Sequence, residues 1–428
     1  MIRQISYKFL LIIVAAGIIG TMVLTIAFAL PTERIQDHVH NATKTFEQEK
    51  TYFSITSGVE GTQIDNYTEA IYLNQAMVSG DPFKCAISGY TFQIPDKKLN
   101  PVENLNAVIE KPFEAVLDQT CVRFFNGYEI VIKPLLMLTK YGQIRQINLY
   151  AVFALFMLLC YLMLKNNLGI YIVPFTLAFL YINPVTISVT LTFVFFYYCS
   201  IIPCIIILLF NDYLKRGYRY YFFFEVVGVC AFYFNMNYFQ LITFGFPLTF
   251  YYLINGLPLK WTDVITKSLS FLGVWFLGYV GIMLFKWILY AALYDHDFFA
   301  KMFAHAQQRL SDHQGDVSFS RWQAVNRNMK YVIMNWSWLI MEIVFTIICV
   351  YNWYKEKAYN IIHRNKLKAE VAFVFFMILL PLLRYFIYAN HVMIHHWVTY
   401  RIFSISILVF NVFLVKYCYG KIGEYELT

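Results

Sequence analysis

The sequence predicts an all-α integral membrane protein with about ten transmembrane helices. Composition is the first observation, because 59% of the 428 residues are hydrophobic and only 14% are charged. A water-soluble domain has roughly a quarter of its residues charged. The second observation is a series of apolar runs long enough to cross a bilayer, and the third is the position of Lys and Arg between those runs.

The first apolar run, 9–30, follows Arg3 and Lys8. A cleavable signal peptide would usually have a shorter apolar core that ends in small residues, so we expect an uncleaved first helix. The other expected transmembrane helices cover 149–164, 168–182, 186–210, 220–235, 238–255, 268–293, 331–353, 369–389 and 398–418.

Basic residues indicate how these helices are threaded. With the N-terminus inside, the short connections assigned to the outside, 183–185, 235–238 and 390–397, contain no Lys or Arg. The connections assigned to the inside contain Lys165, Lys215, Arg216, Arg219, Lys260, Lys267, Lys355, Lys357, Arg364, Lys366 and Lys368. This distribution follows the positive-inside rule and predicts that both termini are cytoplasmic. It also explains the net charge of +8 without a nucleic-acid partner.

The chain therefore divides into a first helix at 1–30, an extracytoplasmic region at 31–148 and a multi-pass region at 149–428 with a second outer loop at 294–330. Apolar residues have helical spacing in 68–77 and 104–117, so the large first loop is expected to contain short helices at the membrane surface. Cys85 and Cys121 share this loop and could form a disulfide outside the cytoplasm.

Asp65 and Glu69 begin one of these helical stretches. Asp65 is placed to cap the helix, which is the structural interpretation. The functional interpretation makes it a general base, because a carboxylate can take the proton from a sugar hydroxyl that attacks an anomeric carbon. The sequence does not separate Asp65 from Glu69 in this role.

A second polar cluster lies at the outer rim of the last two expected helices, with Arg384, His391, His395 and Arg401. Ionisable residues at such depths are costly and are candidates for function, although Arg and His can also anchor helix ends. His391 and His395 are four residues apart, which would permit a metal, but no carboxylate ligand stands beside them. Binding of a phosphate is the preferred interpretation.

Asp295, His296 and Asp297 follow the expected helix 268–293 at the same face. They could bind a divalent cation or substrate, and a solvated helix end is an equal alternative. Lys286 lies inside that helix, where it would be costly unless it faces a polar cavity, snorkels or meets a phosphate.

Several motifs resemble, in order, those of a bacterial family of multi-pass glycosyltransferases of the GT-C type. These motifs are Ile64-Asp-Asn-Tyr-Thr-Glu69, Arg123-Phe-Phe-Asn-Gly-Tyr128 with Lys133-Pro-Leu-Leu136, Asn237-Tyr-Phe-Gln240, Leu277-Gly-Tyr-Val-Gly281, and Asn390-His391 with Thr399-Tyr-Arg401. The resemblance implies that the acid of the first loop is the catalytic base. It also implies that Arg and His at the outer face hold the phosphate of a polyprenyl-phosphate sugar.

On this interpretation the protein is an inverting glycosyltransferase of the bacterial plasma membrane. It would transfer sugar from the lipid-linked donor to a glycan or lipid acceptor of the cell envelope. No cofactor is required on this interpretation, and a divalent cation is an optional one. Three other functions stay open: an envelope polysaccharide polymerase or ligase, a transporter or flippase of lipid-linked sugar, and a membrane acyltransferase. The absence of an internal repeat disfavours the transporter.

Overall fold

The computed structural model describes residues 2–95, 98–234, 238–314, 317–355 and 364–418. Among these residues, seven helices are long and apolar enough to cross a membrane. They are α1 (Ile2–Phe28), α7 (Tyr141–Lys165), α10 (Leu191–Leu214), α13 (Trp261–Leu293), α16 (Trp336–Lys355), α17 (Arg364–Ile387) and α20 (Ser404–Cys418, extended on its N-terminal side by shorter helices). The protein is thus a helical membrane protein, as the composition predicts.

Three of the ten expected membrane helices are shorter than predicted. They are α8 (Ile172–Tyr181), α11 (Arg219–Tyr233) and α12 (Ile242–Asn255). At about 1.5 Å per residue, none spans the roughly 30 Å of the hydrocarbon core by itself. Residues 238–241, expected to open a helix, lie in a turn ahead of α12, and residue 235 lies outside the described residues. Within the described residues, seven of the ten expected spans are thus long and apolar enough to cross a membrane, and the crossing by α8, α11 and α12 stays a prediction.

The first loop folds into short elements, as its apolar spacing predicts. Its helices are α2 (Glu33–Glu49), α3 (Asn66–Ala76), α4 (Pro82–Ser88), α5 (Pro101–Glu110) and α6 (Glu129–Leu138), with 3₁₀ turns η1 (Glu60–Thr62) and η2 (Pro112–Glu114). The second half of the helical stretch expected at 104–117 is partly a strand instead, because β1 (Thr91–Gln93) pairs antiparallel with β2 (Val116–Asp118).

The second loop contains α14 (Phe298–Leu310), the strands β3 (His313–Gln314) and β4 (Val317–Ser318), and α15 (Arg321–Met334). The remaining short elements are η3 (Gly169–Tyr171), α9 (Pro184–Val189), α18 (Ala389–Ile394), α19 (His396–Thr399) and η5 (Tyr400–Phe403).

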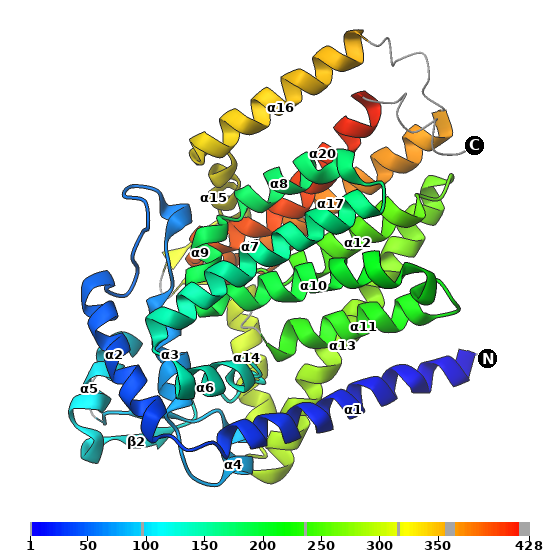
Figure 1. Cartoon of the computed structure of the whole chain (residues 1–428). Helices are drawn as coiled ribbons and strands as arrows, with labels where there is room; N and C mark the ends of the chain where they lie inside the picture. Colours follow the sequence, from blue (N-terminus) through cyan, green and yellow to red (C-terminus); the bar gives the residue numbers. More distant parts are fainter. Residues whose placement is uncertain (1, 96–97, 235–237, 315–316, 356–363, 419–428) are drawn as a thin grey trace.

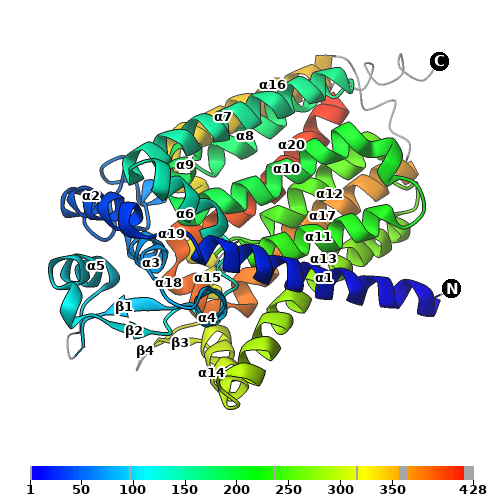
Figure 2. The ribbon, with the colours of Figure 1, turned by 60° about the horizontal axis from the view of Figure 1, so that its bottom comes forward.

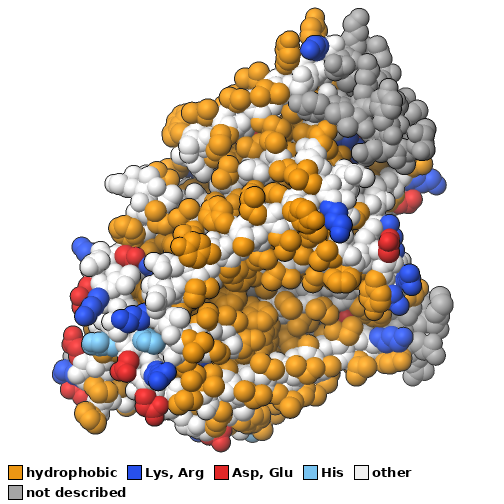
Figure 3. All heavy atoms as spheres, in the orientation of Figure 1, with side chains coloured by type: hydrophobic (Ala, Val, Ile, Leu, Met, Phe, Trp, Pro, Cys, Tyr) orange, Lys and Arg blue, Asp and Glu red, His pale blue; other side chains and the backbone are white. Residues whose placement is uncertain are grey.

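The helices of the bundle run between two ends of the molecule. α1 begins and α20 ends at one end, whereas α2, α3 and α5 lie at the other (Figure 1). The turned view places α14 and α18 at the same end as β1 and β2 (Figure 2). Hydrophobic side chains cover the helices between the two ends, and charged side chains gather at the ends (Figure 3). The end formed by α2–α6, α14, α15, α18 and α19 is called the loop end below.

Two glycines allow α11 and α13 to pack backbone against backbone. A Cβ atom at Gly228 would lie 1.9 Å from the carbonyl oxygen of Trp275, and one at Gly278 would lie 2.1 Å from that of Glu225. Small residues permit such close approach between membrane helices. This contact fixes α13, which leads directly into the second loop.

Candidate functional site

Asp65 is the N-cap of α3 and is almost completely buried. Its Oδ1 accepts a hydrogen bond from the backbone N–H of Thr68 (3.1 Å), and its Oδ2 accepts from the hydroxyls of Thr68 (2.7 Å) and Tyr238 (2.9 Å). Burial raises the pKa of the Asp65 carboxyl above its usual range, although these hydrogen bonds oppose the shift. The predicted helix cap is therefore confirmed, and the same carboxylate also contacts Tyr238 from a distant part of the chain.

Tyr238 joins Asp65 to the histidines of the last outer turn. The centroid of its ring lies 6.0 Å from that of His391 and 5.3 Å from that of His395, and the two histidine rings are 4.7 Å apart. Burial, together with the nearby charge of Arg309, lowers the pKa of His395 to about 3. The structure thus brings together two of the predicted clusters, and His395 is neutral near neutral pH.

Glu69 lies one helical turn after Asp65 and has different partners. It accepts hydrogen bonds from the hydroxyl of Tyr141 (2.8 Å) and the backbone N–H of Thr192 (2.9 Å). Burial raises its pKa to about 7, against the opposing charge of Arg145. Glu69 therefore connects α3 to the first turns of α7 and α10.

Arg145 extends this connection toward the first loop. Its guanidinium forms an ion pair with Glu49 (2.7 Å) and donates to the side-chain oxygen of Asn66 (3.0 Å). Asn66 in turn donates to Glu49 (3.0 Å). The residue next to Asp65 is therefore held between α2 and α7.

Arg384 is buried near the end of α17, and its guanidinium carbon lies 3.7 Å from the centroid of the Tyr388 ring. The chain then enters α18, which carries His391. Arg384 thus lies on α17 shortly before His391 and His395, whose rings lie near each other and near that of Tyr238.

Arg401 has a different environment from Arg384. Its guanidinium donates to four backbone carbonyl groups, those of Ile182 (2.8 Å), Gly61 (2.9 Å), Trp397 (3.1 Å) and Val398 (3.5 Å). The Gly61 oxygen also accepts from the hydroxyl of Tyr400 (3.1 Å). This geometry gives Arg401 a positioning role, because it holds the η1 turn four residues before Asp65.

Lys286 is likewise bound to backbone. Its ammonium donates to the carbonyl oxygens of Ala86 (3.1 Å) and Ile87, at the C-terminal end of α4. A cation at this end of a helix is favoured by the helix dipole. Lys286 therefore connects α13 to the first loop. The polar partner expected for this lysine is the C-terminal end of α4.

Asp295, His296 and Asp297 do not converge on one point. Asp295 forms an ion pair with the exposed Lys301 (2.7 Å) and accepts from the backbone N–H of Asp297 (3.0 Å). The nearby ammonium of Lys301 lowers the pKa of Asp295. No group of three or more His, Cys, Asp or Glu side chains within the described residues could hold a metal ion. These contacts favour the interpretation of a solvated helix end.

Cys85 and Cys121 are both buried, and both are free thiols in the structure, which does not contain the disulfide considered for them. Burial raises the pKa of Cys121 to about 12 and also raises that of Cys85. The two thiols are therefore protonated near neutral pH.

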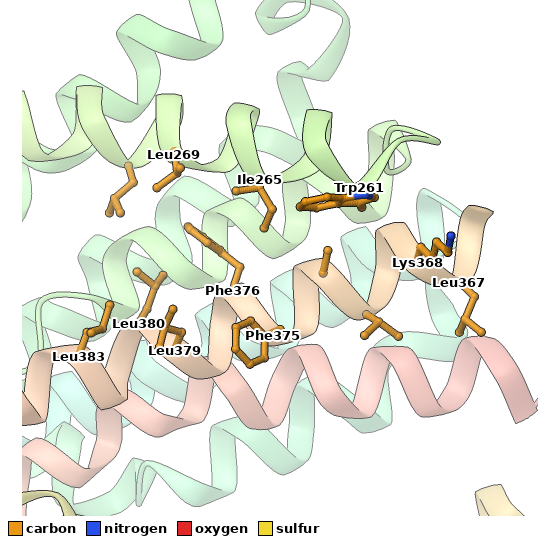
Figure 4. A pocket seen from close by; sticks show the side chains of 13 residues that line it. Trp261, Ile265, Leu269, Leu367, Lys368, Phe375, Phe376, Leu379, Leu380 and Leu383 are labelled. Atoms are coloured by element: carbon orange, nitrogen blue, oxygen red, sulfur yellow. The ribbon is translucent and has the colours of Figure 1, made fainter. Parts of the chain in front are cut away.

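A long apolar groove lies between α13 and α17 (Figure 4). It has a volume of about 890 Å³ and runs from Trp261 and Lys368 to Leu383. Leu383 immediately precedes Arg384, so this end of the groove lies one residue from Arg384 along α17.

Three more residues near the histidines, Tyr238, Arg123 and Arg309, were not predicted as site residues, although the first two lie in motifs quoted above. Arg123 and Arg309 interact electrostatically with each other, and Arg309 also interacts with His395 and Tyr238. Arg309 is the only basic residue in the last turn of α14. A basic residue at this position is common at helix ends, so it does not by itself indicate a binding site. Nothing in the sequence around Tyr238 indicates its contact with Asp65.

Comparison with known proteins finds no match to the chain among family models, curated proteins or solved structures.

Proposed function

We propose that the protein is a GT-C-like glycosyltransferase that moves a sugar from a polyprenyl-linked phosphate donor to a cell-envelope glycan or lipid. The reaction would take place at the loop end, on the extracytoplasmic face of the plasma membrane. The observation that carries this proposal is the hydrogen bond from Tyr238 to the buried carboxylate of Asp65, because the ring of Tyr238 also lies near those of His391 and His395.

Asp65 has the properties that a general base needs. A carboxylate has about four acceptor positions on its two oxygens, and the three hydrogen bonds from Thr68 and Tyr238 leave one for an acceptor hydroxyl. Its raised pKa makes it a stronger base than an exposed aspartate. The hydrogen bonds hold it in one orientation while it takes the proton.

The groove between α13 and α17 suits the hydrocarbon chain of the donor. The stretch of α17 from Leu367 to Leu383 lines one wall over about 24 Å, at about 1.5 Å per residue. A prenyl chain in this groove would bring its phosphate to Arg384, whose guanidinium can bind phosphate oxygens in pairs.

The reaction is a single displacement. The acceptor oxygen forms a bond to the anomeric carbon while the bond from that carbon to the phosphate oxygen breaks. The electron pair leaves with the phosphate, and the acceptor proton moves to Asp65. Arg384 and His391 would stabilise the negative charge on the phosphate. The acceptor oxygen attacks from the face opposite the leaving phosphate, so the anomeric centre is inverted.

A panel of labelled polyprenyl-phosphate and polyprenyl-diphosphate sugars, given to purified protein in lipid, tests the proposal. Mass analysis of the product separates addition of one sugar from addition of an oligosaccharide block. Lipid-linked sugar that crosses the membrane without bond formation would support a flippase, and transfer of an acyl group would support an acyltransferase. Either result would replace the proposal.

A further inference from the structure

One face of α14 carries a histidine and an arginine toward the C-terminal end of the helix. Phe298, Met302, His305 and Arg309 are spaced so that they share one face of the helix. Phe298 and Met302 are buried in a cluster that includes Tyr290. His305 and Arg309 continue this face toward the end of the helix.

The end of α14 is tied to the helix that carries His391. The backbone N–H of Asn390 donates to the carbonyl oxygen of Ser311, at 3.0 Å. Ser311 is two residues beyond Arg309, and Asn390 immediately precedes His391. This hydrogen bond places Arg309 beside α18, in agreement with its electrostatic interactions with His395 and Tyr238.

Arg123 reaches the same place from the first loop. Its carbonyl oxygen accepts from the indole N–H of Trp287 (3.0 Å), and the ring of Trp287 lies 6.2 Å from that of Phe298 in α14. The Nε of Arg123 is buried and has no hydrogen-bond partner within the described residues. Arg123 therefore lies beside α14 with part of its guanidinium unused.

The described residues provide no carboxylate ion pair for Arg123 or Arg309. Burial and the charge of Arg123 lower the pKa of both His305 and Arg309. Both arginines are partly buried, and a nearby like charge disfavours the charged form of each. An anion bound between Arg123 and Arg309 would relieve this repulsion.

We propose that Arg123 and Arg309 bind phosphoryl oxygens of the donor, and that the donor is a polyprenyl diphosphate saccharide. Two guanidinium charges match the two negative charges of a diphosphate diester, whereas a phosphate diester carries one. The leaving group is then the polyprenyl diphosphate, which takes the electron pair of the broken bond to the anomeric carbon. This inference rests on the proposed function and favours a polymerase or ligase among its variants.

The methyl esters of farnesyl diphosphate and of farnesyl monophosphate test the inference, since they share one chain and carry two negative charges and one. Binding to purified protein in lipid nanodiscs is measured for the wild type, Arg123→Gln, Arg309→Gln and Arg309→Lys, with the exposed Arg34→Gln of α2 as a control. We expect the wild type to prefer the diphosphate by about tenfold or more, equivalent to about 1.4 kcal/mol. The two Gln variants should lose that preference, Arg309→Lys should keep part of it, and Arg34→Gln should retain it.

Equal wild-type affinity for the two probes would overturn the inference, as would unchanged preference in both Gln variants. Thermal unfolding of each variant shows whether it is folded. If a Gln variant does not fold, the preference of Arg309→Lys for the diphosphate still tests the inference. Transfer from monophosphate donors that needs Asp65 but neither arginine would reject the inference and keep the proposed function. Diphosphate binding that needs the arginines, without transfer from any donor, would support the inference and reject the proposed function.

Discussion

The hydroxyl of Tyr238 donates a 2.9 Å hydrogen bond to Oδ2 of Asp65, across 173 positions of sequence. The same hydroxyl lies 2.9 Å from that of Thr68, so Asp65, Thr68 and Tyr238 form a closed triangle. One corner of the triangle belongs to the first loop and another to the turn before α12. The position of the proposed base is therefore set by the packing of the loop on the bundle.

Tyr238→Phe should weaken catalysis and change its pH dependence. The hydroxyl stabilises the charged form of Asp65, so its removal raises the pKa of the carboxyl further. A base must be deprotonated to act, and the acid limb of the pH–rate profile should therefore move to higher pH. The lost hydrogen bond should reduce the rate by roughly three- to tenfold. Tyr220→Phe, which removes a hydroxyl bound to Asn211 on another helix pair, is the control. An unchanged profile in Tyr238→Phe would contradict this account.

Glu69→Gln should remove a pH dependence of stability. The pKa of Glu69 rises from 4.5 to about 7 on folding, so the folded protein keeps a proton that the unfolded chain loses. The stabilisation is complete below about pH 4.5 and is lost as the pH rises through about 7. Melting temperatures from pH 4.5 to 8 should fall more steeply in the wild type than in Glu69→Gln. The exposed Glu110→Gln should follow the wild type, and identical slopes in all three proteins would reject the prediction.

Gly228→Ala should destabilise the bundle, because the new Cβ would lie 1.9 Å from the carbonyl oxygen of Trp275. Overpacking of this kind costs about 1–3 kcal/mol. Gly273→Ala, in α13, meets no atom within 4 Å and is the matched control. Thermal unfolding in detergent should show a lower melting temperature for Gly228→Ala alone. Equal melting temperatures of the two variants would mean that α11 and α13 are not in backbone contact.

Arg401→Lys should lower stability even though it keeps the charge. One ammonium cannot reach the carbonyl oxygens of Ile182, Gly61 and Trp397 together as the guanidinium does. We expect a loss of about 3 kcal/mol, since hydrogen bonds to charged groups are worth about 1.5–3 kcal/mol each. Unfolding of Arg401→Lys and Arg34→Lys, compared in detergent, measures this loss. A stable Arg401→Lys that only binds donor more weakly would instead assign Arg401 to the phosphate site.

The sequence predicted the helical membrane class and the short helices of the first loop, because apolar runs and their spacing report directly on burial. Within the described residues, seven of the ten expected spans are long and apolar enough to cross a membrane. The runs at 168–182, 220–235 and 238–255 are apolar enough, but turns take up residues at their ends and leave α8, α11 and α12 short.

The candidate site was predictable only in part. Asp65, His391 and His395 were found because polar residues beside apolar runs are conspicuous. The contact of Asp65 with Tyr238 and the position of Arg309 depend on how loops pack in three dimensions, which no local pattern encodes. Arg401 and Lys286 were recognised as costly, but the sequence does not reveal that backbone carbonyls are their partners.

Transfer of labelled sugar by Asp65→Asn, measured beside the wild type and Asp81→Asn, tests the central claim most directly. Asp65 and Asp81 are both helix N-caps in the first loop, and Asn caps a helix nearly as well as Asp, so both variants should fold. Loss of a general base should reduce the rate by about 10²–10⁴-fold. We predict this loss in Asp65→Asn and near wild-type transfer in Asp81→Asn. Full transfer by a folded Asp65→Asn protein would contradict the assignment of Asp65 as the base.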